Sequence, residues 1–247
     1  MLFDSFLIKK LNSSFAIILY ANISFMRILS VLLFLFPFAF SGSAQTVKDL
    51  FGATKYRVTW LGIDYSHVKI VGKIEDFGGQ VPVTAEELQT KWYPAWNQLM
   101  IDEKEKYNLG KMLYRPSVPY DMQMIKNINA TASLDSIEIK KTPFYSEEQI
   151  KGFVAAYPLE DKFGFGAFFI AESMNKNNDE AFYHIVIINM ATKEILVQAR
   201  VRGTASGFGM RNFWAGSYYE AMEKVEDDVY PKWEAQYGPG KSKSSVY

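Results

Sequence analysis

The sequence FGFGAFFIAESMNKNNDEAFYHIVIINMATKEILVQARVRG, residues 163–203, carries the main evidence for the fold that we expect for this chain. It contains three largely apolar runs, Ala167–Met174, Phe182–Ile188 and Ile195–Arg202, separated by short segments of turn-forming residues. β-Branched and aromatic side chains dominate the runs, as they do in strands. Three consecutive strands with short connections form an antiparallel meander, and we expect the rest of the chain to pack against it.

The last two runs differ in pattern. The middle run is apolar on both faces, which predicts a central strand covered on two sides. The last run alternates between two sets with a period of two, and this predicts a strand with one buried and one half-exposed face. The apolar set is Ile195, Val197, Ala199 and Val201, and the opposite set is Leu196, Gln198, Arg200 and Arg202.

Strands and a helix are predicted before the meander. Tyr56–Tyr65 is the first expected strand, and His67–Val71 either extends it or forms a second, short one. The sequence Thr84-Ala85-Glu86-Glu87 is a capping box that opens a long helix, because the Thr84 hydroxyl and the Glu87 carboxylate can each satisfy a free backbone amide. This helix is expected to close within Asp102–Lys106, with a kink or break near Trp92 caused by Pro94.

Two more long helices are predicted. A second capping box begins at Ser146 and opens a helix that Pro158 ends, and the last helix is expected over Phe213–Tyr230, where Pro231 ends or kinks it. A single helical turn is predicted at Val47–Phe51, and a further strand is predicted at Asp121–Asn127.

This order of elements predicts a single α+β domain over residues 45–237. The expected sheet is antiparallel or mixed, with the C-terminal three-strand meander packed against three helices, and the first strand joins it through a helical crossover. Residues 238–247 are polar and without a packing pattern, so we expect a disordered tail.

The N-terminus has the pattern of an export signal. Met26-Arg27 precedes the apolar run Ile28–Phe40 and the small residues Ser41–Ala44, so residues 1–44 are interpreted as a signal peptide cleaved after Ala44. Met26 is a plausible true start. The alternative is an uncleaved anchor formed together with Phe15–Phe25, because the run alone is shorter than the roughly 20 residues of a spanning helix. After cleavage we expect no transmembrane helix.

Composition narrows the class of protein. The 247 residues include 27 basic and 27 acidic ones, and this balance argues against a nucleic-acid binder. The chain has no cysteine, which excludes disulfides, thiolate metal sites and a lipid-modified N-terminal cysteine. An exported domain without disulfides depends on its core for stability, and the combination indicates a periplasmic or secreted bacterial protein.

Few residues are equipped for catalysis. The chain has two histidines, and each has a carboxylate nearby in the expected fold: Asp64 with His67, and Glu172 with His184 on paired strands. Such a pair can perform general acid–base chemistry, or it can be a buried hydrogen bond. No nucleophile motif accompanies either pair and no third metal ligand is evident, so we expect neither a metal nor a cofactor.

Two other features have both a structural and a binding interpretation. The glycine-rich loop 203–209 is either a turn or, with Arg211, a small anion site at a helix N-terminus. Flat aromatic rings can line a carbohydrate or peptide groove, but they also fill cores. The tryptophans at helical positions, for which core packing is favoured, are Trp92, Trp96, Trp214 and Trp233.

One hairpin carries a resemblance. The sequence Asn189-Met190-Ala191-Thr192-Lys193-Glu194-Ile195-Leu196 resembles the hairpin D-x-x-T-G-E-V-L of many envelope proteins. With the helix that follows, residues 163–233 are similar in layout to α+β accessory domains of the bacterial periplasm, such as the N-terminal domain of TolB and the lipoprotein activators of penicillin-binding proteins. The chain departs from this pattern in lacking the lipid-modified cysteine and in having Lys193 where glycine is usual. The resemblance implies a non-catalytic domain that engages other envelope proteins, and it transfers no functional residue.

The sequence therefore leads to two hypotheses from different classes. The first is an exported cell-envelope protein that binds a protein or a glycan without catalysis. The alternative is a secreted or periplasmic hydrolase that uses one of the carboxylate–histidine pairs, Glu172 with His184 or Asp64 with His67.

Overall fold

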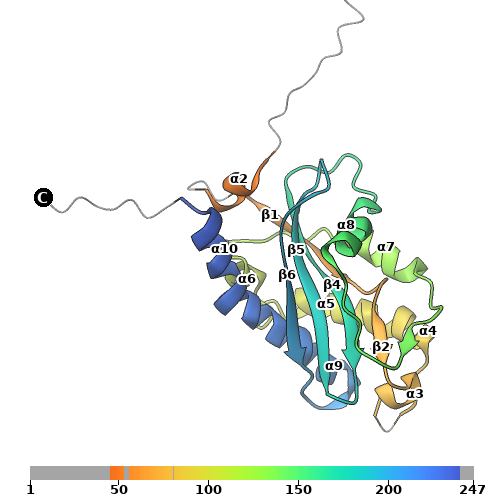
Figure 1. The fold of residues 1–247 in the computed structure, drawn as a ribbon. Coiled ribbons are helices and arrows are strands. Elements are labelled where there is room, and N and C mark those ends of the chain that lie inside the picture. The colour runs from red at the N-terminus through yellow and green to blue at the C-terminus, as the bar shows by residue number, and fades with distance from the viewer. Residues whose placement is uncertain (1–44, 53–55, 80, 240–247) are drawn as a thin grey trace, which may run out of the picture. The chain divides into compact units, whose positions relative to one another are not determined.

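The computed structural model describes residues 45–52, 56–79 and 81–239, and these build a mixed sheet with helices packed on it (Figure 1). The strands are β1 (Val58–Asp64), β2 (Lys69–Val71), β3 (Glu138–Ile139), β4 (Phe165–Asn175), β5 (Glu180–Asn189) and β6 (Glu194–Thr204). The α-helices are α2 (Val47–Phe51), α3 (Ile74–Phe77), α4 (Ala85–Glu87), α5 (Tyr93–Asp102), α6 (Leu109–Met112), α7 (Gln123–Thr131), α8 (Glu147–Ala155), α9 (Gly209–Lys224) and α10 (Tyr230–Tyr237). Two π-helical turns, η1 (Leu88–Trp92) and η2 (Val225–Val229), interrupt the first and last long helices.

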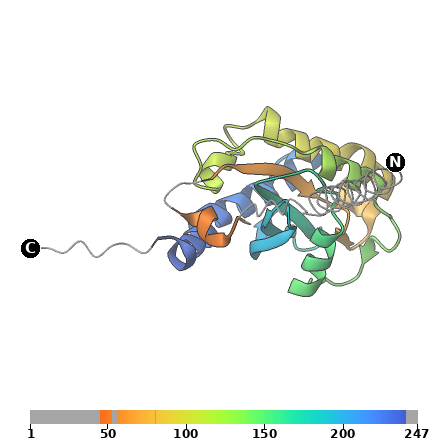
Figure 2. The ribbon, with the colours of Figure 1, turned by 90° about the horizontal axis from the view of Figure 1, so that it is seen from above.

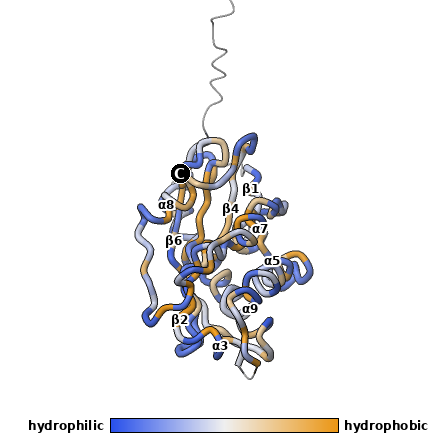
Figure 3. The backbone as a smooth tube through the Cα atoms, turned by 90° about the vertical axis from the view of Figure 1, so that its right-hand side faces the viewer, coloured by the Kyte–Doolittle hydropathy of each residue, from blue (hydrophilic) through white to orange (hydrophobic). Residues whose placement is uncertain are grey.

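The predicted meander is confirmed, and so is the α+β class with a mixed sheet. Strands β4, β5 and β6 pair antiparallel in sequence order. Strands β1 and β2 both run parallel to β4, β1 beside Phe165–Ile170 and β2 beside Ser173–Asn175, and β3 extends the sheet beyond β2. Because β4 has neighbours on both edges, every residue of it is buried, and it is among the hydrophobic stretches in Figure 3.

Helices cover both faces of the sheet (Figure 2). Alternate residues of β4 point to opposite sides: Phe169 belongs to the cluster that includes Trp96 of α5 and Trp214 of α9, whereas Phe168 belongs to the cluster that includes Ile125 of α7 and Ile150 of α8. The sheet therefore lies between two apolar clusters. A few polar side chains of the strands, Glu172 and His184 among them, are buried beside these clusters.

The prediction of a strand over Asp121–Asn127 is wrong, because most of this segment belongs to the first turns of helix α7. Ile125 and Asn129 are buried four residues apart, which is helical spacing. The sequence concealed this periodicity because one buried position is an asparagine. Its side chain accepts a hydrogen bond from the Tyr65 amide at 2.7 Å and donates to the Ile63 carbonyl at 2.9 Å, which closes part of the free edge of β1.

The expected alternation along β6 holds only in part. Val197 and Val201 are buried on the face of α9, as predicted. Ile195 lies on the opposite face, against the cluster under α8, because the pairing with β5 shifts register between Ile187 and Ile188. The shift is a β-bulge, in which β6 has one residue more than β5. The side chains of β6 that precede the bulge therefore point to the opposite face from the one that strict alternation predicts.

The kinks expected at the two prolines take the form of π-helical turns. The helix that opens at Thr84 continues through η1 into α5, and its capping box is present. The Tyr93 amide bonds to the Leu88 carbonyl and the Tyr230 amide to the Val225 carbonyl, each spanning five residues. The wider turn relieves the clash that a proline ring would make with the carbonyl four residues before it.

Two expectations lie outside the described residues, namely the signal peptide over 1–44 and residues 240–247 of the tail. Within residues 45–52, 56–79 and 81–239, no helix is long and apolar enough to cross a membrane.

Candidate functional site

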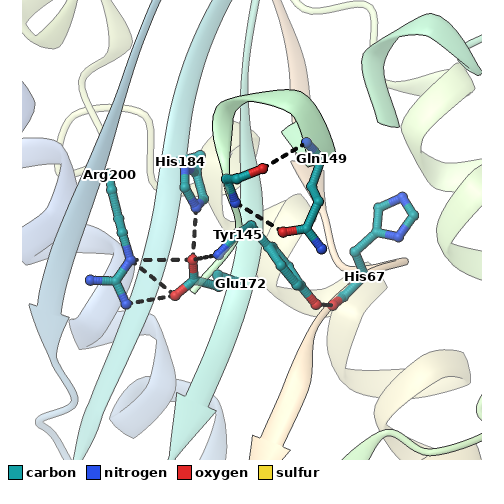
Figure 4. Close-up of polar contacts among 7 residues, drawn as sticks. His67, Tyr145, Gln149, Glu172, His184 and Arg200 are labelled. Carbon is teal, nitrogen blue, oxygen red and sulfur yellow. Dashed lines mark hydrogen bonds and ion pairs between the residues drawn. The ribbon is translucent and has the colours of Figure 1, made fainter. Parts of the chain in front are cut away.

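Glu172 and His184 come together, as the strand pairing predicted. Glu172 is the extra residue of a bulge in β4, where the register with β5 shifts between Ala171 and Ser173, and His184 lies opposite Ile170. The bulge turns the carboxylate toward the histidine, and His184 Nε2 lies 2.9 Å from Glu172 Oε2. Both side chains are buried on the face covered by α8 (Figure 4).

Two further groups, which the sequence analysis did not connect with this pair, bind the same carboxylate. Arg200 of β6 donates from Nη2 to Glu172 Oε1 at 2.6 Å and from Nε at 3.0 Å. The backbone amide of Tyr145, just before α8, donates to Oε2 at 2.9 Å. Each carboxylate oxygen thus accepts at least two hydrogen bonds, from two neighbouring strands and one loop (Figure 4).

This environment keeps Glu172 charged. Burial acts to raise its pKa, but the hydrogen bonds from His184, Arg200 and the Tyr145 amide outweigh burial and hold the pKa below its ordinary value. The Arg200 guanidinium in turn lies 3.6 Å from the centre of the Phe182 ring. A carboxylate whose oxygens are occupied in this way is suited to fixing the loop at Tyr145 on the sheet, and it has little capacity left to accept a substrate proton.

Asp64 and His67 are close in the chain, but no hydrogen bond joins their side chains in the described structure. Asp64 is buried and accepts from the Ser66 amide at 2.7 Å and from the Tyr157 hydroxyl. The His67 ring stacks on Phe153 with 3.5 Å between ring centres. Burial lowers the pKa of His67, against the opposing charge of Asp64, so its imidazole is neutral near pH 7.

A hollow of about 510 Å³ borders His67. The Ser66 hydroxyl is buried beside it and has no hydrogen-bond partner among the described residues. Other polar groups converge on the hollow from Lys69, Asp135 and Tyr145. The neutral imidazole of His67, at the border of this hollow, is a group able to perform acid–base chemistry.

A second hollow, of about 630 Å³, lies between the α3–α4 loop and the β6–α9 loop; we call it the aromatic groove. Its aromatic lining consists of Phe77, Trp92, Phe208 and Phe213. The sequence of the second loop predicts a turn or an anion site, and no local pattern connects it with the first loop. The usable signal was Phe208 between two glycines, a large apolar ring within a segment that its turn-forming residues predict to be exposed.

The structure shows the surroundings of the four tryptophans and of Arg211, next to the glycine loop. Trp96 and Trp214 are fully buried and Trp233 nearly so, which confirms core packing for these three, whereas Trp92 lines the aromatic groove. Arg211 Nη2 lies 3.4 Å from Glu103 Oε1, so the guanidinium forms an ion pair and does not lie at an open anion site.

No set of three or more His, Asp or Glu residues in the described ranges is arranged to hold a metal ion. Comparisons with protein-family models, with curated proteins and with solved structures found no match to this chain.

Proposed function

We propose that this chain is an exported protein of the bacterial cell envelope that works by binding an envelope partner, a protein or a glycan. The observation that carries the proposal is the aromatic groove, with Phe208 95% exposed at its rim. The N-terminal export pattern, the absence of cysteine and the balanced charge support the location. The occupied carboxylate of Glu172 supports a role without catalysis at that residue.

In-cell crosslinking tests this function. The full chain is expressed with a C-terminal tag, crosslinked in living cells and purified, and mass spectrometry identifies both the copurifying molecules and the N-terminus of the tagged chain. We expect an N-terminus at Gln45 and a stoichiometric envelope partner. A chain that retains residues 1–44 in the cytoplasm and captures nothing from the envelope would contradict the proposal.

A hydrolase remains the second candidate function, and the hollow at His67 is the observation that favours it. The purified protein is assayed with ester, glycoside and phosphate substrates, and so are the variants His67→Ala and His184→Ala. Turnover that disappears in the first variant would establish the enzyme and place its chemistry at this hollow. Absence of turnover throughout agrees with the binding role.

A further inference from the structure

We propose that the aromatic groove takes a short peptide segment in which an apolar side chain is flanked by carboxylates. This inference rests on the proposed binding function and names the class of partner: an acidic, apolar segment of another protein.

Apolar surface is concentrated at the rim of the groove. Phe208 is 95% exposed and Val81 71%, and they come from loops about 130 residues apart in the sequence. Between them the floor is apolar and aromatic, with Phe77 and Phe213 in it. An exposed ring beside an apolar hollow is the arrangement of a protein-binding hot spot, where a partner side chain fills the hollow and the ring covers it.

Glycines form part of both walls. Gly79 and Gly209 have φ values of 77° and 75°, and a Cβ at either position would meet no atom within 4 Å, so both face open space. A left-handed conformation without a side chain lets a ligand approach the backbone of the groove closely. An extended or turned peptide backbone fits beside such a wall.

The charges at the groove favour an anionic occupant. Lys91 Nζ lies 4.7 Å from the centre of the Trp92 ring, and no carboxylate in the described part of the chain pairs with it. Lys176 Nζ lies 4.1 Å from the centre of the Phe213 ring and pairs with the half-exposed Asp179. Carboxylates on a partner would meet the Lys91 ammonium and, in competition with Asp179, the Lys176 ammonium, each held against an aromatic ring.

The polar groups of the groove distinguish a peptide from a glycan. Side-chain amides and carboxylates are suitable partners for sugar hydroxyls, and no Asn, Gln or Asp among the described residues lines the groove. Its one carboxylate, Glu87, accepts from the Thr84 amide in the capping box. The indole Nε1 of Trp92, a residue that lines the groove, is buried and has no hydrogen-bond partner among the described residues.

The test uses defined peptides and the protein purified after expression of the full chain. N-acetylated, C-amidated pentapeptides with a central phenylalanine between aspartates are titrated into 15N-labelled protein. Two control peptides replace the aspartates with lysines or the phenylalanine with alanine. Binding is followed by the amide shifts of Gly78, Gly79, Val81 and Val83 in the first loop and of residues 207–213 in the second.

We expect saturable shifts confined to these loops, and binding at least about tenfold weaker for either control peptide. Phe208→Ala is expected to weaken binding about tenfold and Lys91→Gln about threefold, with a weaker salt dependence in the latter, because Lys176 remains. Phe163→Ala is the matched control, because Phe163 is an exposed phenylalanine (77%) outside the groove, and it should leave binding unchanged.

Equal binding of the lysine peptide, or an unchanged affinity in Phe208→Ala, would overturn the proposal. So would shifts of the same amides by trigalacturonic acid but not by any peptide, which would assign the groove to an acidic glycan. If crosslinking captures an envelope protein with equal yield from Phe208→Ala, the proposed function stands and this inference fails.

Discussion

At the scale of single residues, a few polar side chains hold the layers of the molecule together. Glu172 connects β4, β5, β6 and the loop before α8 through one carboxylate. Asn97 and Asn129 connect two helices with the edge of β1. Because each is buried, loss of one partner leaves another polar group without a hydrogen bond, and this is costly.

Replacing Glu172 with glutamine should lower the free energy of unfolding by about 3 kcal/mol at pH 7, because His184 and Arg200 lose a charged partner. The folded-state pKa of Glu172 lies below the ordinary value of 4.5, so its stabilising effect is complete above that pH. The effect is lost as the pH falls through the folded-state pKa. Urea denaturation of both proteins from pH 7 to about pH 3 should show the difference shrinking, and a difference that stays constant with pH would contradict the assigned role.

Asn97→Ala should destabilise the fold by about 2 kcal/mol. Asn97 Oδ1 accepts from the buried Ile63 amide at 2.8 Å, and alanine leaves that amide without a partner. Gln98→Ala is the control, because its amide bonds only to Asp102 on the exposed side of the same helix, and it should change stability by less than about 0.5 kcal/mol. Equal effects of the two substitutions in thermal unfolding would disprove the role of Asn97.

At the scale of elements, two helices accommodate an internal proline in the same way. Each continues through a Tyr-Pro-x-Trp sequence, at Tyr93–Trp96 and Tyr230–Trp233, by widening into a π-turn just before it. The similarity of the two sequences thus reflects the same local problem, a proline inside a helix, solved in the same way.

Helix α9 depends on a close approach to β6. A Cβ added at Gly203 would lie 1.7 Å from the Ser217 carbonyl oxygen, so Gly203→Ala must push the helix away from the strand. We expect a loss of about 3 kcal/mol in the free energy of unfolding. Gly152→Ala in α8 is the matched control, since no atom lies within 4 Å of the added methyl group, and it should stabilise by up to about 1 kcal/mol. Chemical denaturation of both variants distinguishes them by sign.

At the scale of the whole described unit, β4 and β5 contribute residues to both apolar clusters. Unfolding of the cluster on one face of the sheet would therefore disrupt the cluster on the other face. We therefore expect one cooperative unfolding transition. Tryptophan fluorescence reports mainly on the cluster around Trp96 and Trp214, whereas circular dichroism reports on all helices, including α7 and α8. The two denaturation curves should coincide, and separate midpoints would show that the α7–α8 layer unfolds independently.

Some elements could be predicted because their signals are local. The meander, the two capping boxes and the end of the first long helix each follow from neighbouring residues, and each is present. That Glu172 and His184 lie near each other followed from their places on two strands joined by a short turn, although the β4 bulge that directs the carboxylate to the histidine was not predicted. Helix α7 was missed because its buried face uses Asn129, whose partner is a distant strand edge, and the facing of Ile195 was missed because a bulge is set by the partner strand.

The α+β class, the meander and the set of groups able to do chemistry can be read from the chain alone, since periodicity, caps and composition act over a few residues. Which of those groups come together depends on tertiary contacts. These contacts surround Glu172 with Arg200 and Tyr145, give Asp64 and His67 different partners, and join two distant loops into the aromatic groove. These contacts join residues far apart in the chain, and no local pattern encodes them, because the free energy that selects them comes from burying the whole core at once.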